Sequence, residues 1–191
     1  ELGDMEFGIK ILHPETLKDE KFTTRFKRGV VASSTVQHPN VIRSFELIKE
    51  EDVIAYTMEY PSGGTLQDRL DAGREFSVDE VLNLFSQLCS GMIAVHDAGI
   101  IHRDLRPRAI WYTDGHTAKI SNFGIASVPM GRQVTKHGEV VGSNRYVSPE
   151  YIETSMFDER SDVYGLALLI FMVATGTVSY THLTLPTRCL G

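Results

Sequence analysis

The chain has 191 residues and a formal net charge of −6, and 42% of its residues are hydrophobic and 23% charged. This composition describes a globular protein with a sizeable core and excludes the disordered and fibrous classes. The acidic balance argues against a general nucleic-acid binder, which needs a basic face. Two cysteines, Cys89 and Cys189, are too few for a disulfide scaffold, so we expect a reducing compartment.

Two segments bear on targeting and membranes. Residues 1–10 lack the basic-then-apolar pattern of a secretory signal. The most apolar run, residues 163–173, is too short to span a bilayer and is better interpreted as a buried helix. We therefore expect a cytoplasmic location and no membrane contact within this segment, and the sequence leaves open whether a longer parent protein is anchored.

Three apolar segments in the first third of the chain predict strands. Residues 5–12 are strand-like and contain one lysine, Lys10, which alone would be interpreted as an edge or snorkelling residue. Residues 41–48 and 53–59 predict a hairpin with a charged turn between them. A helix is expected between these elements, because residues 19–35 begin with helix formers.

The clearest helix is predicted over residues 77–98. Ser77 is placed as its N-cap, and Glu80 three residues later completes a capping box. Cys89 and His96 within it are interpreted as core or helix-end residues, because no Cys/His cluster has zinc spacing. The apolar residues that recur at helical spacing are Val81, Leu84, Phe85, Leu88, Met92 and Val95.

The most specific pattern is carried by residues 101–124. They read IHRDLRPRAIWYTDGHTAKISNFG: His-Arg-Asp, a short apolar run, a turn at Asp114–Gly115, a second short strand and Asn-Phe-Gly. This order and spacing resemble the catalytic loop and the magnesium loop of protein kinases. Other parts of that pattern occur in the right order: FGIK at 7–10, HPN at 38–40, MEYPSGG at 58–64, GSNRYVSPE at 142–150 and SDVYGLALLIFMVATG at 161–176.

The resemblance covers residues 3–176 and is strongest to the eukaryotic-like Ser/Thr kinases of bacteria, because GSNRYVSPE follows their Gly-Thr-x-x-Tyr pattern. It implies an α+β, bilobal protein-kinase-like fold with a small β-rich N-lobe and a mainly helical C-lobe, both incomplete. On this interpretation residues 1–60 form the partial N-lobe up to the hinge. Residues 61–176 form the partial C-lobe through its central helix.

Both ends of the chain depart from the family pattern. The Gly-rich loop that lies over the nucleotide phosphates should precede the first strand, so we expect the chain to lack it. Residues 178–187, VSYTHLTLPT, show no apolar period that continues the lobe, and they resemble the translation of a common sequencing adapter. We therefore expect residues 177–191 to be a non-native tail.

The resemblance assigns catalytic and phosphate-binding roles to three residues. Asp104 corresponds to the aspartate that accepts or orients the proton of the attacking hydroxyl. Arg106 stands where a lysine contacts the γ-phosphate; it keeps the charge but is bulkier and not equivalent. Lys10 corresponds to the lysine that reaches the α- and β-phosphates.

The adenine side of the site is assigned by the same resemblance. Met58 would line the back of the pocket, and the backbone of Glu59, Tyr60 and Pro61 would run along the adenine edge. Pro61 has no N–H to donate, so Tyr60 must carry more of any hinge hydrogen bonding. Trp111 falls where a smaller aliphatic residue floors the pocket; whether it narrows the site or stacks on the base is left open by the sequence.

Three departures from the family bear on activity. Asn122 replaces the magnesium-binding aspartate, and its amide lacks the charge that holds a dication beside a polyphosphate. Ala109 replaces a metal-binding asparagine and has no side-chain oxygen to bind a metal, so Asn122 is the one candidate metal contact. Gly29 occupies the position of the glutamate that pairs with the phosphate-binding lysine. A shifted register does not restore this pair, because no acidic residue lies within residues 21–45.

Other residues of the pattern have alternative interpretations. Arg103, Arg106 and Arg108 make the loop basic and suit metal-free phosphate binding. The alternative is that Arg103 serves structural or activation-loop contacts and that Arg108 is solvated. Residues implied to act downstream are Ser143 near Asp104, the Ser148-Pro149-Glu150 anchor, Asp162 as a brace of the catalytic loop, and Ser127 and Thr135 as phosphorylation sites.

The sequence thus predicts a Ser/Thr-type protein-kinase-family domain of ATP-binding ancestry that is impaired in phosphoryl transfer and acts as a signalling pseudokinase. The alternative is an active kinase that transfers the ATP γ-phosphate to protein Ser/Thr with Lys10, Asp104 and its arginines. A small-molecule phosphotransferase fits the substrate-side loop poorly. The implied cofactor is ATP, with magnesium weak or absent, and the implied partner is a protein substrate or signalling protein rather than a nucleic acid.

Overall fold

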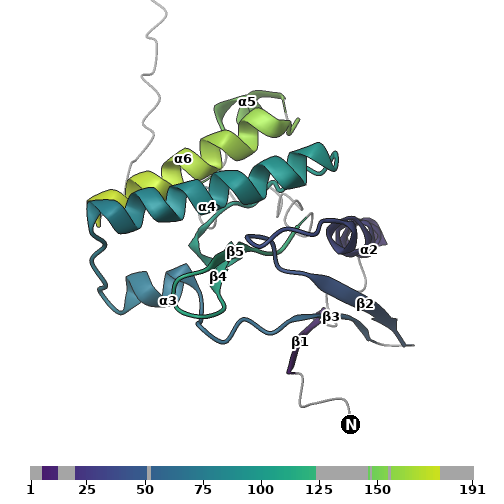
Figure 1. The fold of residues 1–191 in the computed structure, drawn as a ribbon. Coiled ribbons are helices and arrows are strands. Elements are labelled where there is room, and N and C mark those ends of the chain that lie inside the picture. The colour runs from purple at the N-terminus through teal and green to yellow at the C-terminus, as the bar shows by residue number, and fades with distance from the viewer. Residues whose placement is uncertain are drawn as a thin grey trace, which may run out of the picture.

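The computed structural model describes residues 6–12, 20–50, 53–123, 146, 148–154 and 156–176. These residues form two parts, a small sheet with one helix and a larger helical part (Figure 1). None of the described helices is long and apolar enough to cross a membrane. The elements are β1 (Phe7–Ile11), α2 (Glu20–Thr35), β2 (Ser44–Lys49), β3 (Ile54–Glu59), α3 (Leu66–Asp71), α4 (Val78–Asp97), a 3-10 turn (Pro107–Ala109), β4 (Ile110–Tyr112), β5 (Ala118–Ile120), α5 (Pro149–Thr154) and α6 (Glu159–Thr175).

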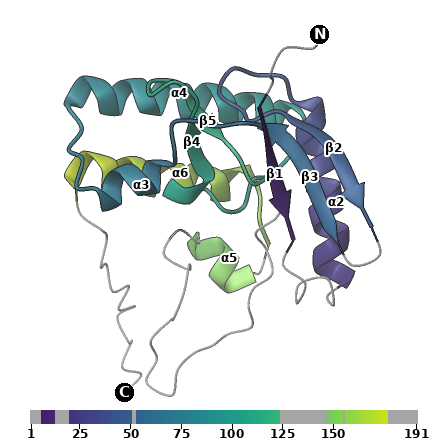
Figure 2. The same ribbon diagram turned by 90° about the horizontal axis from the view of Figure 1, so that it is seen from below.

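The smaller part is an antiparallel sheet in the order β1–β3–β2 with α2 beside it (Figure 2). Side chains alternate along β1: Phe7, Ile9 and Ile11 are exposed, whereas Gly8 and Lys10 are partly buried. This alternation is that of a strand with one solvated face. The core of the small part consists of Leu12, Phe26, Val30, Ile42, Ile54, Tyr56 and Met58.

The larger part contains α3 to α6 and the antiparallel hairpin β4–β5. The predicted capping box of α4 is present: Glu80 N–H donates to Ser77 Oγ at 3.3 Å, and Ser77 N–H donates to Glu80 Oε2 at 2.9 Å. The helix packs on the hairpin and on α6, and it carries much of the core. Its buried apolar residues are Val81, Leu84, Leu88, Met92 and Val95.

Two predicted burials are wrong in part. Phe85 was expected on the buried face of α4 but is 41% exposed. It follows Leu84 by one residue, a turn of about 100° around the helix, and so lies at the edge of the apolar stripe. In α6, Val163 and Phe171 are 60% and 54% exposed while Leu169 is fully buried. The apolar run is therefore a half-buried helix rather than a fully buried one.

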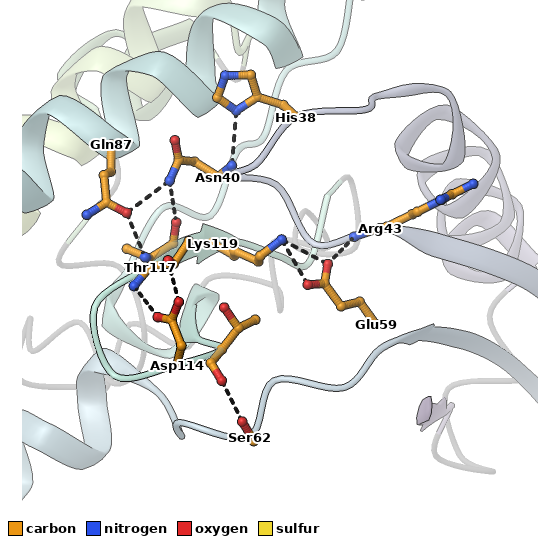
Figure 3. A network of polar contacts seen from close by, with 11 residues as sticks. His38, Asn40, Arg43, Glu59, Ser62, Gln87, Asp114, Thr117 and Lys119 are labelled. Atoms are coloured by element: carbon orange, nitrogen blue, oxygen red, sulfur yellow. Dashed lines mark hydrogen bonds and ion pairs between the residues drawn. The ribbon is translucent and has the colours of Figure 1, made fainter. Parts of the chain in front are cut away.

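A short segment after α2 ties the small sheet to the larger part. Ile42 N–H donates to the Ile120 carbonyl at 2.8 Å, and Ile120 N–H donates to the Asn40 carbonyl at 2.9 Å. The Asn40 amide also donates to Gln87 Oε1 at 3.0 Å and to the Ala118 carbonyl at 2.9 Å (Figure 3). Strand β5 and helix α4 thus hold the turn that follows α2.

Because α4 packs closely against this segment, we expect alanine substitutions at two helical glycines to have different effects on stability. A Cβ on Gly91 would lie 2.8 Å from the Asn40 carbonyl oxygen and 3.0 Å from Ile120 Cδ1. Gly91→Ala should therefore lower the free energy of unfolding by about 1–3 kcal/mol through overpacking, despite the better helix propensity of alanine. Urea denaturation measures this change.

Gly165→Ala is the matched control, because a Cβ there would meet Leu105 at 3.4 Å, an ordinary contact. Gly165 lies in the middle of α6, so alanine should be neutral or stabilising by up to about 1 kcal/mol. Equal destabilisation by both substitutions would contradict the close packing of α4 against Asn40.

Candidate functional site

The loop that carries His102, Arg103 and Asp104 is held by a carboxylate on α6. Asp162 is buried; its Oδ1 accepts from Arg103 N–H at 2.7 Å, and its Oδ2 accepts from His102 N–H at 2.7 Å. His96 Nε2 lies 2.9 Å from the same Oδ2. Arg103 has a φ of 70°, a left-handed backbone that non-glycine residues rarely adopt. The brace expected from Asp162 is present and fixes this conformation.

His102 joins the loop to the segment after β5. It is fully buried, and its Nε2 lies 2.7 Å from the Ser121 carbonyl oxygen. Its Nδ1 accepts from Asp104 N–H at 3.2 Å, so Nε2 carries the proton and donates to Ser121. Burial lowers the pKa of His102, which agrees with a neutral ring. Phe123 packs edge-on against it at 5.2 Å between ring centroids.

Four of the predicted site residues come together at this point. Arg106 Nε lies 2.8 Å from Asp104 Oδ2 in an ion pair. The Lys10 ammonium, from β1, donates a hydrogen bond to Asn122 Oδ1. Asn122 has a φ of 69°, which asparagine tolerates better than most residues. Elements from both parts of the molecule therefore meet here: β1 of the sheet, the loop after α4 and the segment after β5.

The side chains of Lys10, Arg106 and Asp104 together carry a net positive charge. Burial, and then the nearby Arg106 guanidinium, lowers the pKa of Lys10 to about 8, so the ammonium still carries its proton at neutral pH. Burial raises the pKa of Asp104 to about 6, although Arg106 and Lys10 oppose that rise. Two cations thus share one carboxylate, and such a group suits an anionic ligand such as phosphate.

The donor set does not fit magnesium. Ala109 is fully buried, and its carbonyl oxygen accepts from Ser121 N–H at 2.8 Å and from Ser121 Oγ at 3.1 Å. Asn122 Oδ1 is engaged by Lys10. No cluster of three His, Cys, Asp or Glu side chains that could hold a metal occurs within the part of the chain that is described. Magnesium in nucleotide sites is bound through carboxylates, and the carboxylate described in this group, Asp104, is ion-paired with Arg106.

The predicted adenine residues lie at the end of β3 and on β4. Met58 is buried in the core of the small part, and Tyr60 is half-exposed at the surface. The Glu59 carboxylate lies 2.8 and 3.0 Å from Lys119 Nζ and accepts weakly from Arg43 N–H at 3.4 Å (Figure 3). This ion pair links β3 directly to β5.

The sequence did not single out Lys119. The predicted hairpin around Asp114–Gly115 could have indicated its position, because Lys119 pairs with Trp111 in the β4–β5 register. Register partners share one face of a hairpin, so Lys119 could have been placed on the same side as Trp111. Its partner on β3 could not be deduced from that register.

Two small residues of α2, Gly29 and Ser33, are buried. Gly29 is buried within α2 and provides no side chain to meet Lys10. Ser33 Oγ lies 2.9 Å from Ser44 Oγ, a buried pair that the sequence did not indicate. A small pocket beside this pair separates α2 from the segment after β5. Its lining is Val30, Ser33, Ile42, Ser44, Tyr56, Ser121, Asn122 and Phe123.

Some of the remaining predicted residues lie within the described part of the chain, and others lie outside it. Arg108 is exposed, and the Arg103 guanidinium lies 5.9 Å from the Phe157 ring centroid. In α5, Glu150 Oε1 accepts from Ser161 Oγ at 3.0 Å. Gly124, Ser127, Thr135, Ser143 and residues 177–191 lie outside the described residues.

A small antiparallel sheet with one helix, joined to a helical part that carries a braced His-Arg-Asp loop, defines the bilobal fold of a protein kinase. The family described as "Protein kinase domain" matches residues 3–186, and the chain belongs to this family. The kinase domain of Mycobacterium tuberculosis PknI, solved as a point mutant, shares this fold. Its TM-score is 0.72 at 24% identity, over 88% of this chain and 63% of that one.

Similar curated proteins place the chain more narrowly. It is 32% identical to the serine/threonine-protein kinase PrkC of Bacillus subtilis over 93% of its length, and 30% identical to the probable serine/threonine-protein kinase PknB of Lactococcus lactis over 94%. The chain is therefore a domain of the eukaryotic-like Ser/Thr kinase type. It spans only 27% and 28% of those two relatives.

The raised pKa of Asp104 predicts a pH dependence of stability. In the unfolded chain the Asp104 carboxyl has the ordinary pKa of 3.8, whereas in the folded protein its pKa is about 6. Its contribution to stability is therefore complete below about pH 4 and falls as the pH rises to about 6. The full loss is about 3 kcal/mol, since one pKa unit corresponds to about 1.4 kcal/mol.

Asp104→Asn removes this titration. The free energy of unfolding of the variant minus that of the wild type should rise between about pH 4 and pH 6 and then level off. Urea denaturation at a series of pH values measures this difference. A difference that is flat or falls across that window would contradict the burial of Asp104.

Proposed function

We propose that this domain is a signalling pseudokinase, a Ser/Thr kinase-family domain that transfers phosphate poorly and acts by binding a protein partner. The observation that carries the proposal is the contact between Lys10 and Asn122. The phosphate-binding lysine meets a neutral amide in place of a carboxylate, and that amide stands where the family holds its metal. The activity of the whole protein is part of the proposal, because the chain spans about a quarter of its curated relatives.

The chemistry of the family explains why these replacements matter. Phosphoryl transfer depends on positioning and charge neutralisation, and in kinases it requires both the lysine–glutamate pair and the magnesium aspartate. Here Gly29 offers no partner for the lysine, and Asn122 and Ala109 offer no anionic ligand. Removing one such electrostatic contact costs about 10²–10³-fold in rate in well-studied enzymes. Three replacements together support a strongly impaired transfer.

The assignment of regions and roles belongs to the same proposal. Residues 1–60 form the N-lobe to the hinge and residues 61–176 the C-lobe, while residues 177–191 form a tail that is not native to the domain. The family implies ATP as the nucleotide that the hinge would take, with magnesium binding weak or absent. The residues that would contact it are Lys10, Met58, Glu59, Tyr60, Trp111 and Asn122, with Asp104 and Arg106 on the phosphate side.

One observation favours the second candidate, an active Ser/Thr protein kinase. Asp104 keeps its place beside Arg106, and a pKa near 6 brings this carboxyl closer to the range of a general base at neutral pH. Lys10 and Arg106 would then neutralise charge on the phosphates. In either case the partner is a protein, as the names of the relatives indicate for those proteins.

Restoring the metal ligands tests the proposal. The double variant Ala109→Asn/Asn122→Asp should transfer the γ-phosphate to a generic protein substrate at least about 10² times faster than the wild type. The assay uses saturating millimolar ATP with and without magnesium. Only the variant should depend on the metal, because only it presents a carboxylate there.

Asp104→Ala in the restored background is the control and should abolish the gained transfer. The proposal would be overturned by robust transfer in the wild type that disappears on Asp104→Ala alone. That result would establish the active kinase instead.

A further inference from the structure

Trp111 faces the small lobe and not the core of its own lobe. Its neighbours on β4, Ile110 and Tyr112, are buried in the core of the large lobe. Side chains alternate along a strand, so Trp111 lies on the opposite face of the hairpin. It is half-buried and packs against the small-lobe core cluster that contains Tyr56 and Met58. The indole is therefore an apolar contact between the two lobes.

An ion pair lies beside this contact. Lys119 is the register partner of Trp111 and shares its face of the hairpin. Its ammonium lies 2.8 Å from Glu59 Oε1, and the Lys119 and Glu59 side chains are only 13% and 30% exposed (Figure 3). Glu59 follows Met58 at the end of β3. The hairpin thus contacts the start of the hinge twice, by packing and by charge.

The backbone holds Trp111 in this place. Gly63 N–H donates to the Tyr112 carbonyl at 2.7 Å, and Tyr112 N–H donates to the Gly64 carbonyl at 2.9 Å. Thr65 forms an isolated antiparallel bridge with Trp111. A Cβ on Gly63 would lie 2.7 Å from the Tyr112 oxygen, so the hinge segment can approach β4 this closely only at a glycine. The strand cannot withdraw the indole without breaking these bonds.

We propose that the Trp111 indole occupies the interlobe space in which a nucleotide base would lie, and that Trp111 and the Lys119–Glu59 pair hold the lobes together without nucleotide. An indole and a purine are both planar fused rings of five and six members, so one can take the space of the other. Pro61, in the hinge, also lacks an N–H for a base. This inference rests on the proposed function, since a domain that does not need ATP tolerates a filled base site.

The chain's single tryptophan makes the inference directly measurable. In the wild type, Trp111 fluorescence should be weakly quenched by acrylamide and should not change on addition of ATP, ADP or adenosine at concentrations that saturate the Trp111 variants. Trp111→Leu opens the base site and should bind ATP at least tenfold more tightly than the wild type, measured by thermal shift and calorimetry without magnesium. Trp111→Met provides a second variant in case leucine impairs folding.

Phe171→Leu is the matched control, because Phe171 is an exposed aromatic residue of α6. It should leave nucleotide binding unchanged. The inference is overturned if the wild type binds ATP as tightly as Trp111→Leu, if ATP changes Trp111 fluorescence at concentrations that saturate the variant, or if neither Trp111 variant gains binding.

Phosphoryl transfer measured on the same samples separates this inference from the proposed function. Wild-type protein that binds ATP tightly but transfers no phosphate would overturn the role of Trp111 and leave the pseudokinase proposal standing. Wild-type protein that transfers phosphate efficiently would overturn the pseudokinase proposal itself.

Discussion

The buried carboxylate of Asp162 is the interaction on which the rest of the site depends. It accepts from the backbone N–H groups of His102 and Arg103 and contacts the ring of His96. Burying a carboxylate is costly unless hydrogen bonds replace its water, and these donors supply them. Because the bonds hold Arg103 at a φ of 70°, they also set the position of Asp104 next to it.

This frame does not depend on the residues at the metal-binding positions of the family. The buried hydrogen bond between His102 and the Ser121 carbonyl links the loop to the segment after β5. It thereby helps to position the backbone of Asn122. None of these contacts involves a metal ligand or a phosphate. The frame can therefore persist with Ala109 and Asn122 at the positions of the metal ligands, which explains how the sequence keeps a kinase-like loop together with these replacements.

The sequence predicted well what depends on local pattern. The capping box at Ser77, the hairpin at Asp114–Gly115 and the strand around Lys10 follow from spacing and turn chemistry, and the structure confirms them. Contacts between distant residues were missed. Lys119 and Glu59 are 60 residues apart, and nothing local specifies their pairing. The orientation of the indole at position 111 also needed the tertiary structure, because strand alternation alone does not say which lobe covers which face.

The central claim is that the site keeps its frame but holds no metal, and paramagnetic NMR tests it directly. Amide resonances of the ¹⁵N-labelled protein are recorded with ATP and then with ATP and Mn²⁺, which broadens signals near a bound ion. The account predicts no selective broadening at Ala109 and Asn122 beyond that of exposed amides. Strong broadening centred on these two positions would show a resident metal and contradict it.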